Sequence, residues 1–365
     1  MRKRKICLVI PSLHPGGMER VMTELAVYFC GKKEFEVHLL LYGINREIFY
    51  EVPSNLIIHK PHFEFNNSYR IWNTIKTLWF LRLKVREIDP DTLLSFGELW
   101  NNFVLLATLG LKVPVFVSDR CQPDKSLGRV HDVLRNWLYP KAKGVICQTE
   151  AAKRIYQQLF NHATFVVIGN PIRDIEPNTT LPKENIILTV GRLIKTKHHD
   201  ELIQIFASIN APDWRLVIVG DDALKQNNKV RLKQLAKDLG IAERVELVGK
   251  RSDVDNFYNQ ARIFAFTSSS EGFPNVIGEA MSSGLPVVAY DCTAGPSDLI
   301  EDGKSGYLIP LHDTKAFKDG LEKLIYDEKT RINFGLEAKS IIKKFSVENI
   351  GQQFELTIFN ARTSN

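Results

Sequence analysis

The chain has 365 residues, of which 44% are hydrophobic and 25% are charged, and its formal net charge is +6. This composition is ordinary for a globular protein, and the length exceeds what one hydrophobic core usually supports, so we expect two domains. The five cysteines form no C-x-x-C pair, which excludes a disulfide framework and a cysteine zinc site. No apolar run approaches the roughly 20 residues that span a bilayer.

The N-terminus superficially resembles a secretion signal, because basic residues 2–5 precede the apolar residues 6–10. This apolar run is too short for a signal, and Pro11 ends it. We therefore interpret residues 6–10 as a first β-strand and expect a cytoplasmic protein.

The rest of the chain alternates between strand-like and helix-like segments. Strands are predicted at 6–10, 35–41, 92–95, 113–118, 144–147 and 164–168, and then at 185–190, 214–219, 245–248, 262–267, 286–289 and 307–309. Helices are predicted at 18–30, 69–87, 99–109, 128–139 and 150–159, and then at 199–209, 227–239, 253–259, 275–283, 313–327 and 330–344. Such alternation predicts βαβ units and a parallel sheet in each half.

The fold class that follows is α/β, with two Rossmann-like, doubly wound parallel-sheet domains that face a cleft. Three prolines among the polar residues 170–182 mark a connector between them. We expect the first domain at 1–175, the second at 183–344, and a last helix within 345–365 that returns to the first domain.

The most informative stretch runs from residue 268 to 280, where a polar loop follows a strand and leads into a short helix. Pro274 suits the first helical position, and the amides of residues 275–277 would bind an anion at the positive end of the helix. Glu271 and Glu279 flank these amides, a combination that suits a nucleotide-activated sugar. The alternative is a helix start with two solvated glutamates.

Two further loops follow predicted strands and carry candidate phosphate-binding residues. Gly16 and Gly17 let the backbone approach a ligand closely, although they could also serve only as a tight turn, and no G-x-G-x-x-G is present. Arg192 and Lys197 could neutralise a diphosphate, and Arg251 could border the nucleobase. The alternative for these cations is a solvated loop.

No metal site is predicted. Asp89-Pro90-Asp91 matches the D-x-D spelling of metal-dependent sugar transferases, but it precedes a strand and is better explained as a turn. His198 and His199 have no partner at metal-ligand spacing in the sequence, and we expect them on the surface at a helix start.

The ordered set of motifs resembles the retaining glycosyltransferases of family 4, which have the GT-B fold. The resemblance covers nearly the whole chain. It rests on Gly16-Gly17-x-Glu19-Arg20, Gly191-Arg192-Leu193 with Lys197, Glu271-x7-Glu279, Gly284-x-Pro286-Val287-Val288 and Gly306-Tyr307-Leu308-Ile309.

The resemblance implies a role for each matching position. Arg192, Lys197 and Glu271 would be catalytic, with the two cations on the leaving diphosphate and Glu271 on the sugar hydroxyls. Glu279 would bind the ribose. The donor-binding set is Gly16, Gly17, Arg251, Gly272, Phe273, Pro274, Asn275, Val276 and Glu279. The family requires neither a cofactor nor a divalent metal ion.

One departure from the family concerns a histidine that many relatives carry after a strand of the first domain. Here Asp119 and Arg120 occupy the comparable place. Either Arg120 serves an acceptor phosphate or sugar, or His14 approaches the reacting carbon instead. Glu98 ends another strand, and both Glu98 and Asp119 could also contact the acceptor.

The acceptor is expected to be a glycan, with a sugar linked to polyprenyl diphosphate favoured. Residues 1–180 carry 24 Lys and Arg against 17 Asp and Glu, which suggests an anionic partner such as a membrane surface. The segment 69–86 mixes aromatic and basic residues, with Ile71 and Ile75 on one helical side. It could lie on the inner face of the cell membrane, or it could be a core helix with a basic outer face.

The leading interpretation is a retaining hexosyltransferase that uses a nucleotide diphosphate sugar, with UDP expected, in the synthesis of a surface glycan. One alternative is a nucleotide-sugar 2-epimerase of the same fold. Another is a non-catalytic subunit that binds nucleotide sugars. No nucleic acid partner is expected.

Overall fold

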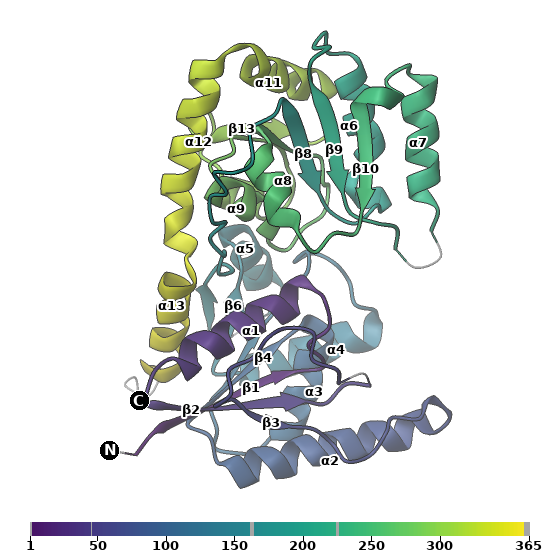
Figure 1. Cartoon of the computed structure of the whole chain (residues 1–365). Helices are drawn as coiled ribbons and strands as arrows, with labels where there is room; N and C mark the ends of the chain where they lie inside the picture. Colours follow the sequence, from purple (N-terminus) through teal and green to yellow (C-terminus); the bar gives the residue numbers. More distant parts are fainter. Residues whose placement is uncertain (1, 45, 161–163, 224–225, 361–365) are drawn as a thin grey trace. The chain divides into compact units, whose positions relative to one another are not determined.

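The computed structural model describes residues 2–44, 46–160, 164–223 and 226–360 (Figure 1). The chain divides into two compact units, the first made of residues 1–171 with 347–365 and the second of residues 172–346. Each unit holds one parallel β-sheet, so the expectation of two Rossmann-like α/β domains is confirmed.

The sheet of the first unit has seven strands in the order β3-β2-β1-β4-β5-β6-β7. Its inner strands are buried on both faces, as in Ile6, which lies opposite Val37 in register and has no exposed surface. The strands are β1 (Arg4–Ile10), β2 (Phe35–Leu41), β3 (Ile57–His59), β4 (Thr92–Phe96), β5 (Val115–Ser118), β6 (Gly144–Cys147) and β7 (Phe165–Val167). The helices are α1 (Gly17–Cys30), α2 (Arg70–Ile88), α3 (Glu98–Thr108), α4 (Arg129–Leu138), α5 (Glu150–Leu159) and α13 (Val347–Asn360).

The sheet of the second unit has six strands in the order β10-β9-β8-β11-β12-β13. The strands are β8 (Ile186–Val190), β9 (Arg215–Val219), β10 (Val245–Gly249), β11 (Ile263–Phe266), β12 (Val287–Asp291) and β13 (Gly306–Pro310). The helices are α6 (His199–Ala207), α7 (Asn228–Asp238), α8 (Val254–Gln260), α9 (Asn275–Ser282), α10 (Pro296–Leu299), α11 (Thr314–Tyr326) and α12 (Glu328–Ile342). Because every strand pair is parallel, all strands end at one edge, the carboxyl edge.

The segment predicted as a connector is part of the second unit. Ile172 and Ile175 are buried in its core, and the amide of Ile172 donates to the carbonyl of Phe345. A Cβ added to Gly278 of α9 would lie 2.6 Å from the Ile172 side chain. Glycine at this helix position therefore leaves room for Ile172. The second unit therefore begins at Ile172, whereas the first domain was expected to continue to residue 175.

Helix α13 belongs to the first unit although it follows the second in sequence, and it lies against α1 (Figure 1). Phe354 is fully buried and contacts Phe96 of β4 at 6.3 Å between ring centroids. Glu355 accepts hydrogen bonds from Tyr28 of α1 and from Lys32, which follows α1, both at 2.9 Å. Apolar and charged contacts together hold the helix in this place.

Helix α2 exposes the side on which Ile71 and Ile75 lie and buries the opposite side. Asn73 and Thr77 are buried, whereas Ile71 and Ile75 are 80% and 50% exposed. The buried polar groups are satisfied locally, because the Asn73 amide donates to the carbonyl of Asn66 and the Thr77 hydroxyl to that of Asn73. The outer face consequently carries large apolar side chains, namely those of Ile71, Trp72, Ile75, Trp79 and Leu83.

Candidate functional site

The strand order of each sheet defines a point where ligands of α/β proteins bind. In the second sheet, β9 and β10 extend from β8 to one side, and β11, β12 and β13 extend to the other. Ligands bind outside the carboxyl edge at such a reversal, which here lies between β8 and β11. The loops that follow these two strands are therefore the first candidates.

Lys197 and Glu271 meet at this point. The loop after β8 ends in a 3₁₀ turn (Lys195–Lys197), and the Lys197 ammonium donates to Glu271 Oε1 at 2.5 Å. The two side chains are only 17% and 15% exposed. The Lys197 ammonium also lies 5.2 Å from the ring centroid of Phe266, the last residue of β11. The pair is thus sheltered from water. Its charges therefore act more strongly on a ligand than they would in water.

Backbone and hydroxyl hydrogen bonds join the same two loops. The Ser269 amide donates to the carbonyl of Thr196 at 2.9 Å, and the Thr267 hydroxyl donates to the carbonyl of Lys197 at 2.8 Å. The positions of Lys197 and Glu271 therefore depend on several bonds besides their own, which is what preorganisation of a site requires.

Close backbone contacts fix the neighbouring loops. Gly220, after β9, has φ +152°, and a Cβ added there would lie 1.8 Å from the carbonyl oxygen of Gly191. Gly295, after β12, has φ +106°, and its added Cβ would lie 2.2 Å from Pro274. Glycine at both positions lets four successive loops pack tightly along the carboxyl edge.

The two candidate arginines differ in their surroundings. Arg192 is exposed, and within the described ranges no hydrogen bond or ion pair of its guanidinium is recorded. Arg251 instead forms a two-pronged pair with Asp253 at 2.7 and 2.8 Å. Arg192 is therefore the cation that remains available to an anionic ligand, whereas the charge of Arg251 is already shared.

The start of α9 differs from the prediction. The helix begins at Asn275, with Pro274 in the cap position rather than the first helical position. The amide of Asn275 donates to the carbonyl of Phe273, and the amide of Ile277 donates to that of Pro274. The expectation of three free amides at 275–277 is therefore wrong for two of them. Phe273, next to Gly272, is buried and contacts the ring of Phe345.

Glu279 lies in a buried polar network, so the alternative of two solvated glutamates is wrong. Its carboxylate is 4% exposed, accepts the Tyr258 hydroxyl at 3.0 Å and lies 3.5 Å from Nε of Arg173. Arg173 also pairs with both oxygens of Asp255. Sequence reasoning missed Arg173 and Tyr258, because one lies in the presumed connector and the other looks like an ordinary core aromatic.

The first sheet reverses between β1 and β4, which places the Gly16-Gly17 loop and Glu98 at its carboxyl edge. The Tyr50 hydroxyl accepts from the Gly16 amide and donates to the Gly16 carbonyl, both at 2.9 Å. Gly16 is extended, and a Cβ added to it would lie 2.2 Å from the flexible end of the Glu19 side chain. Gly17 begins α1 and is exposed, so its amide is the more accessible of the two.

His14 lies half-buried in the same loop, and it is close enough to Glu19 to favour the charged form of the Glu19 carboxylate. Burial acts more strongly in the opposite direction and raises the pKa of Glu19. His14 thus has a carboxylate near it at the carboxyl edge of the first sheet.

Asp119 does not face a ligand. Its carboxylate is 2% exposed and is bound by Arg135 and Tyr139 at 2.5 Å each and by Asn101 at 2.9 Å. The expected acceptor contact of the Asp119 side chain is therefore corrected to a structural role. The pairing was hidden in the sequence, since Arg135 follows on a separate helix.

Arg120 is the unusual cation of the first unit. Its guanidinium donates to Asn170 at 2.5 Å and lies 3.7 Å from the ring centroid of Phe96, and its amide lies 3.3 Å from the Glu98 carboxylate. The Nε and Nη2 atoms are buried without a hydrogen-bond partner. Burial lowers the pKa of Arg120, so an added anion would relieve a desolvated charge.

A hollow of about 410 Å³ opens beside Glu98 in the first unit. Tyr42 and Gly43 follow β2, and Leu99, Trp100 and Phe103 stand on the first turns of α3. The lining also includes Phe65, Asn67, Arg70 and His131. Aromatic walls with a few polar groups suit a sugar or an apolar chain. Only the spacing of Trp100 and Phe103 after Glu98 could have indicated this hollow in the sequence.

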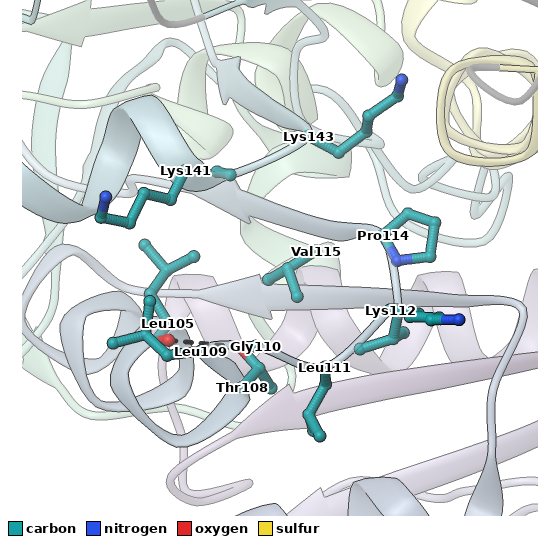
Figure 2. A pocket seen from close by; sticks show the side chains of 12 residues that line it. Leu105, Thr108, Leu109, Gly110, Leu111, Lys112, Pro114, Val115, Lys141 and Lys143 are labelled. Atoms are coloured by element: carbon teal, nitrogen blue, oxygen red, sulfur yellow. Dashed lines mark hydrogen bonds between the residues drawn. The ribbon is translucent and has the colours of Figure 1, made fainter. Parts of the chain in front are cut away.

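A second hollow of about 650 Å³ lies at the opposite, amino edge of the first sheet, where Leu111, Lys112 and Pro114 precede β5 and Lys141 and Lys143 precede β6 (Figure 2). The three lysine side chains in Figure 2 spread away from one another instead of converging. This hollow offers no focused charge, and it lies away from the edge where the other candidate residues gather.

Across the described ranges, no helix is both long enough and apolar enough to cross a bilayer.

Two family descriptions match the chain, "Glycosyltransferase Family 4" over residues 15–174 and "Glycosyl transferases group 1" over residues 171–341. A relative from Campylobacter jejuni, N-acetylgalactosamine-N,N'-diacetylbacillosaminyl-diphospho-undecaprenol 4-alpha-N-acetylgalactosaminyltransferase, is 30% identical over 96% of this chain and 98% of its own length. An uncharacterized glycosyltransferase of Haemophilus influenzae is 27% identical over 93% of this chain and 95% of its own.

Among solved structures, HepE of Anabaena in complex with UDP resembles the chain with a TM-score of 0.80 at 20% identity, over 98% of this chain and 100% of that one. This likeness supports the fold and extends over both units.

Proposed function

The chain belongs to glycosyltransferase family 4 and is a glycosyltransferase of the GT-B fold, and from this premise we propose its reaction. It transfers a hexose or N-acetylhexosamine from a UDP-linked donor to a lipid-diphosphate-linked glycan, with retention of the anomeric configuration. The observation that carries the proposal is the sheltered Lys197–Glu271 pair at the reversal point of the second sheet, with Arg192 in the same loop as Lys197 and unpaired within the described part of the chain.

The donor binds at the carboxyl edge of the second unit in this proposal. Arg192 and Lys197 offset the negative charge that grows on the diphosphate as its bond to the sugar breaks. Glu271 orients Lys197 and accepts a hydroxyl of the donor sugar, and Glu279 takes the ribose hydroxyls. Because two cations of the chain already face the diphosphate, the transfer needs no magnesium ion.

The bond changes balance without a further reactant. The C–O bond between the sugar and the diphosphate breaks, and a C–O bond to the acceptor hydroxyl forms on the same face. The proton of that hydroxyl passes to the departing diphosphate oxygen. The chain contributes position and electrostatic stabilisation rather than a covalent intermediate.

The acceptor binds to the first unit in this proposal. Two buried guanidinium nitrogens of Arg120 have no partner among the described residues, which suits an acceptor phosphate, and the aromatic hollow beside Glu98 suits its sugar or lipid chain. The Campylobacter relative matches along nearly its whole length and is named as a transferase for a sugar linked to diphospho-undecaprenol. That similarity supports the same class of acceptor here.

The enzyme works at the inner face of the cell membrane in this proposal. The exposed apolar side chains of α2 and the basic character of residues 1–180 support contact with an anionic bilayer. A lipid-linked acceptor would be reached from that surface.

The proposal is tested by incubating the full chain with radiolabelled UDP-sugars and polyprenyl-diphosphate-linked sugars, in EDTA and well below the unfolding temperature. We expect transfer from one UDP-sugar, and NMR of the product should show the anomer of the donor. Conversion of the donor without acceptor would instead identify a 2-epimerase. Donor binding without any turnover would identify a binding subunit, and an inverted product would exclude the retaining mechanism.

A further inference from the structure

Two histidines and a glutamate of the second unit meet beside the donor loops. His198 caps the start of α6, Glu201 lies in its first turn, and His312 follows β13. The Nδ1 atoms of His198 and His312 lie 3.9 and 3.0 Å from Glu201 Oε2. One ligand atom from each residue lies within 4.8 Å of the others. Sequence spacing gives His198 no partner, and the fold brings His312 to it.

Neighbouring groups orient each potential ligand. The Tyr290 hydroxyl donates to Oε1 of Glu201, which leaves Oε2 facing the histidines. His198 Nε2 lies 2.9 Å from the Ser269 hydroxyl, which leaves Nδ1 on the cluster side. Such outer contacts commonly fix the ring orientation and tautomer of metal-binding histidines.

The backbone at both histidines is unusual. His198 has φ +48° and His312 has φ +64°, and in the described ranges Asp89 is the other non-glycine residue with positive φ. The left-handed conformation is unfavourable for a residue with a side chain, and glycine and asparagine adopt it most readily. A conformation of this kind at two residues of one cluster is typical of functional sites.

We propose that His198, Glu201 and His312 form a binding site for a divalent transition metal ion of the zinc class, with water completing the coordination. Two imidazole nitrogens and one carboxylate oxygen suit Zn²⁺ and its first-row neighbours, whereas Mg²⁺ and Ca²⁺ prefer oxygen alone. The His312–Glu201 separation suits one ion already, whereas His198 lies farther from Glu201, so a modest rotation of the His198 side chain closes the site.

The bound ion ties the start of α6 to the end of β13. His198 directly follows the 3₁₀ turn that carries Lys197, so the ion stabilises the loop that holds the catalytic cation. It acts on stability and not on bond breaking, since none of its ligands belongs to the proposed transfer machinery. The inference therefore stands or fails independently of the proposed reaction.

The test uses the full chain after treatment with EDTA and dialysis. Titration with Co²⁺ should give a visible absorption band, and Zn²⁺ at about a hundredfold over its dissociation constant should raise the melting temperature by about 5 °C. His198→Asn and His312→Gly suit positive φ, so each metal-free variant should melt at or above the wild-type temperature. Each should bind Co²⁺ at least tenfold more weakly and lose the Zn²⁺-dependent shift.

A matched control comes from the first unit, where His38 and His59 lie 3.0 Å apart and Glu36 contacts His38. His59→Asn should keep the wild-type Co²⁺ band and the Zn²⁺-dependent shift. The proposal is overturned if wild type gives no Co²⁺ band, if His198→Asn and His312→Gly keep the wild-type affinity, or if only His59→Asn loses it.

Discussion

The Lys197 ammonium and the Glu271 carboxylate lie 2.5 Å apart although 74 positions separate them in sequence. They meet because β8 and β11 are neighbours in the sheet and each residue follows the end of its strand. A sheltered ion pair of this kind adds little net stability, because removing both charges from water costs about as much as their attraction returns. The pair is better explained by what it does to a ligand.

Lys197→Ala should lower the transfer rate by about a hundredfold, because one preorganised cation at a departing phosphate contributes on the order of 3 kcal/mol. Glu271→Gln should also reduce the rate, and the double variant should lose less than the two single effects combined. The measurement is kcat with the donor found in the screen. Lys195→Ala, in the same turn but exposed, is the control and should retain activity. Normal turnover of Lys197→Ala would remove this residue from the mechanism.

Arg192→Ala should also lower turnover about a hundredfold, for the same electrostatic reason. Because no partner of its guanidinium is recorded within the described ranges, the melting temperature should not change. Arg215→Ala is the matched control, since this exposed arginine at the start of β9 pairs with Glu184 and Glu246 at the amino edge. Equal activity of the two variants would contradict the role of Arg192.

Gly220→Ala should destabilise the second unit by about 3 kcal/mol or more, because strain from positive φ adds to a steric clash with Gly191. Gly240→Ala shares a positive φ but has no atom within 4 Å of the added Cβ, so it should cost only about 1 kcal/mol. Urea unfolding of both variants measures the difference. Similar midpoints would show that the loops after β8 and β9 separate easily.

Alkaline pH should destabilise the first unit through Cys147. Burial raises the pKa of this thiol to about 12, whereas the pKa in the unfolded chain is about 8.5. Below pH 8.5 both states hold the proton and the thiol has no effect. Above it the unfolded state ionises first, so the free energy of unfolding falls by about 1.4 kcal/mol per pH unit.

Urea midpoints between pH 7.5 and 10 test this effect. Cys147→Ala should have a lower midpoint at pH 7.5, because a buried side chain is shortened, but a shallower decline towards pH 10. An unchanged slope in the variant would show that other groups control the alkaline behaviour.

Replacing Trp72 and Trp79 of α2 by glutamate should weaken binding to phosphatidylglycerol vesicles about tenfold or more, because two exposed apolar anchors become anions. Co-sedimentation at low and high salt measures the affinity. Leu336→Glu on α12 changes an equally exposed apolar residue of the second unit and should have no effect. Equal binding by both variants, or no binding of wild type at low salt, would contradict membrane contact through α2.

The alternation of strands and helices could be predicted because long periodic segments carry a strong signal. The elements that were missed are short, namely β3 with three residues and α10 with four. The face of α2 that is buried could not be predicted, because apolar residues lie on both sides and Asn73 and Thr77 satisfy their polar groups inside.

Candidate residues could be proposed from the sequence only where they lie in a loop that follows a strand. Arg192, Lys197 and Glu271 were proposed on this ground, since strand ends gather at one edge of a parallel sheet. Pairings set by the tertiary fold carry no local signal. The sequence alone does not show that Arg135 pairs with Asp119 or that the ring of His312 contacts that of His198.

The discontinuous first unit has a consequence during synthesis. Its α13 emerges from the ribosome only after residues 172–346 have been made, which takes roughly 10 to 35 seconds at 5–20 residues per second. Until then the nascent unit lacks the cover over Tyr28, Phe29 and Phe96. A chaperone that shields aromatic surface would have its longest opportunity in this interval, and a ribosome stalled before residue 347 would leave the first unit unfinished.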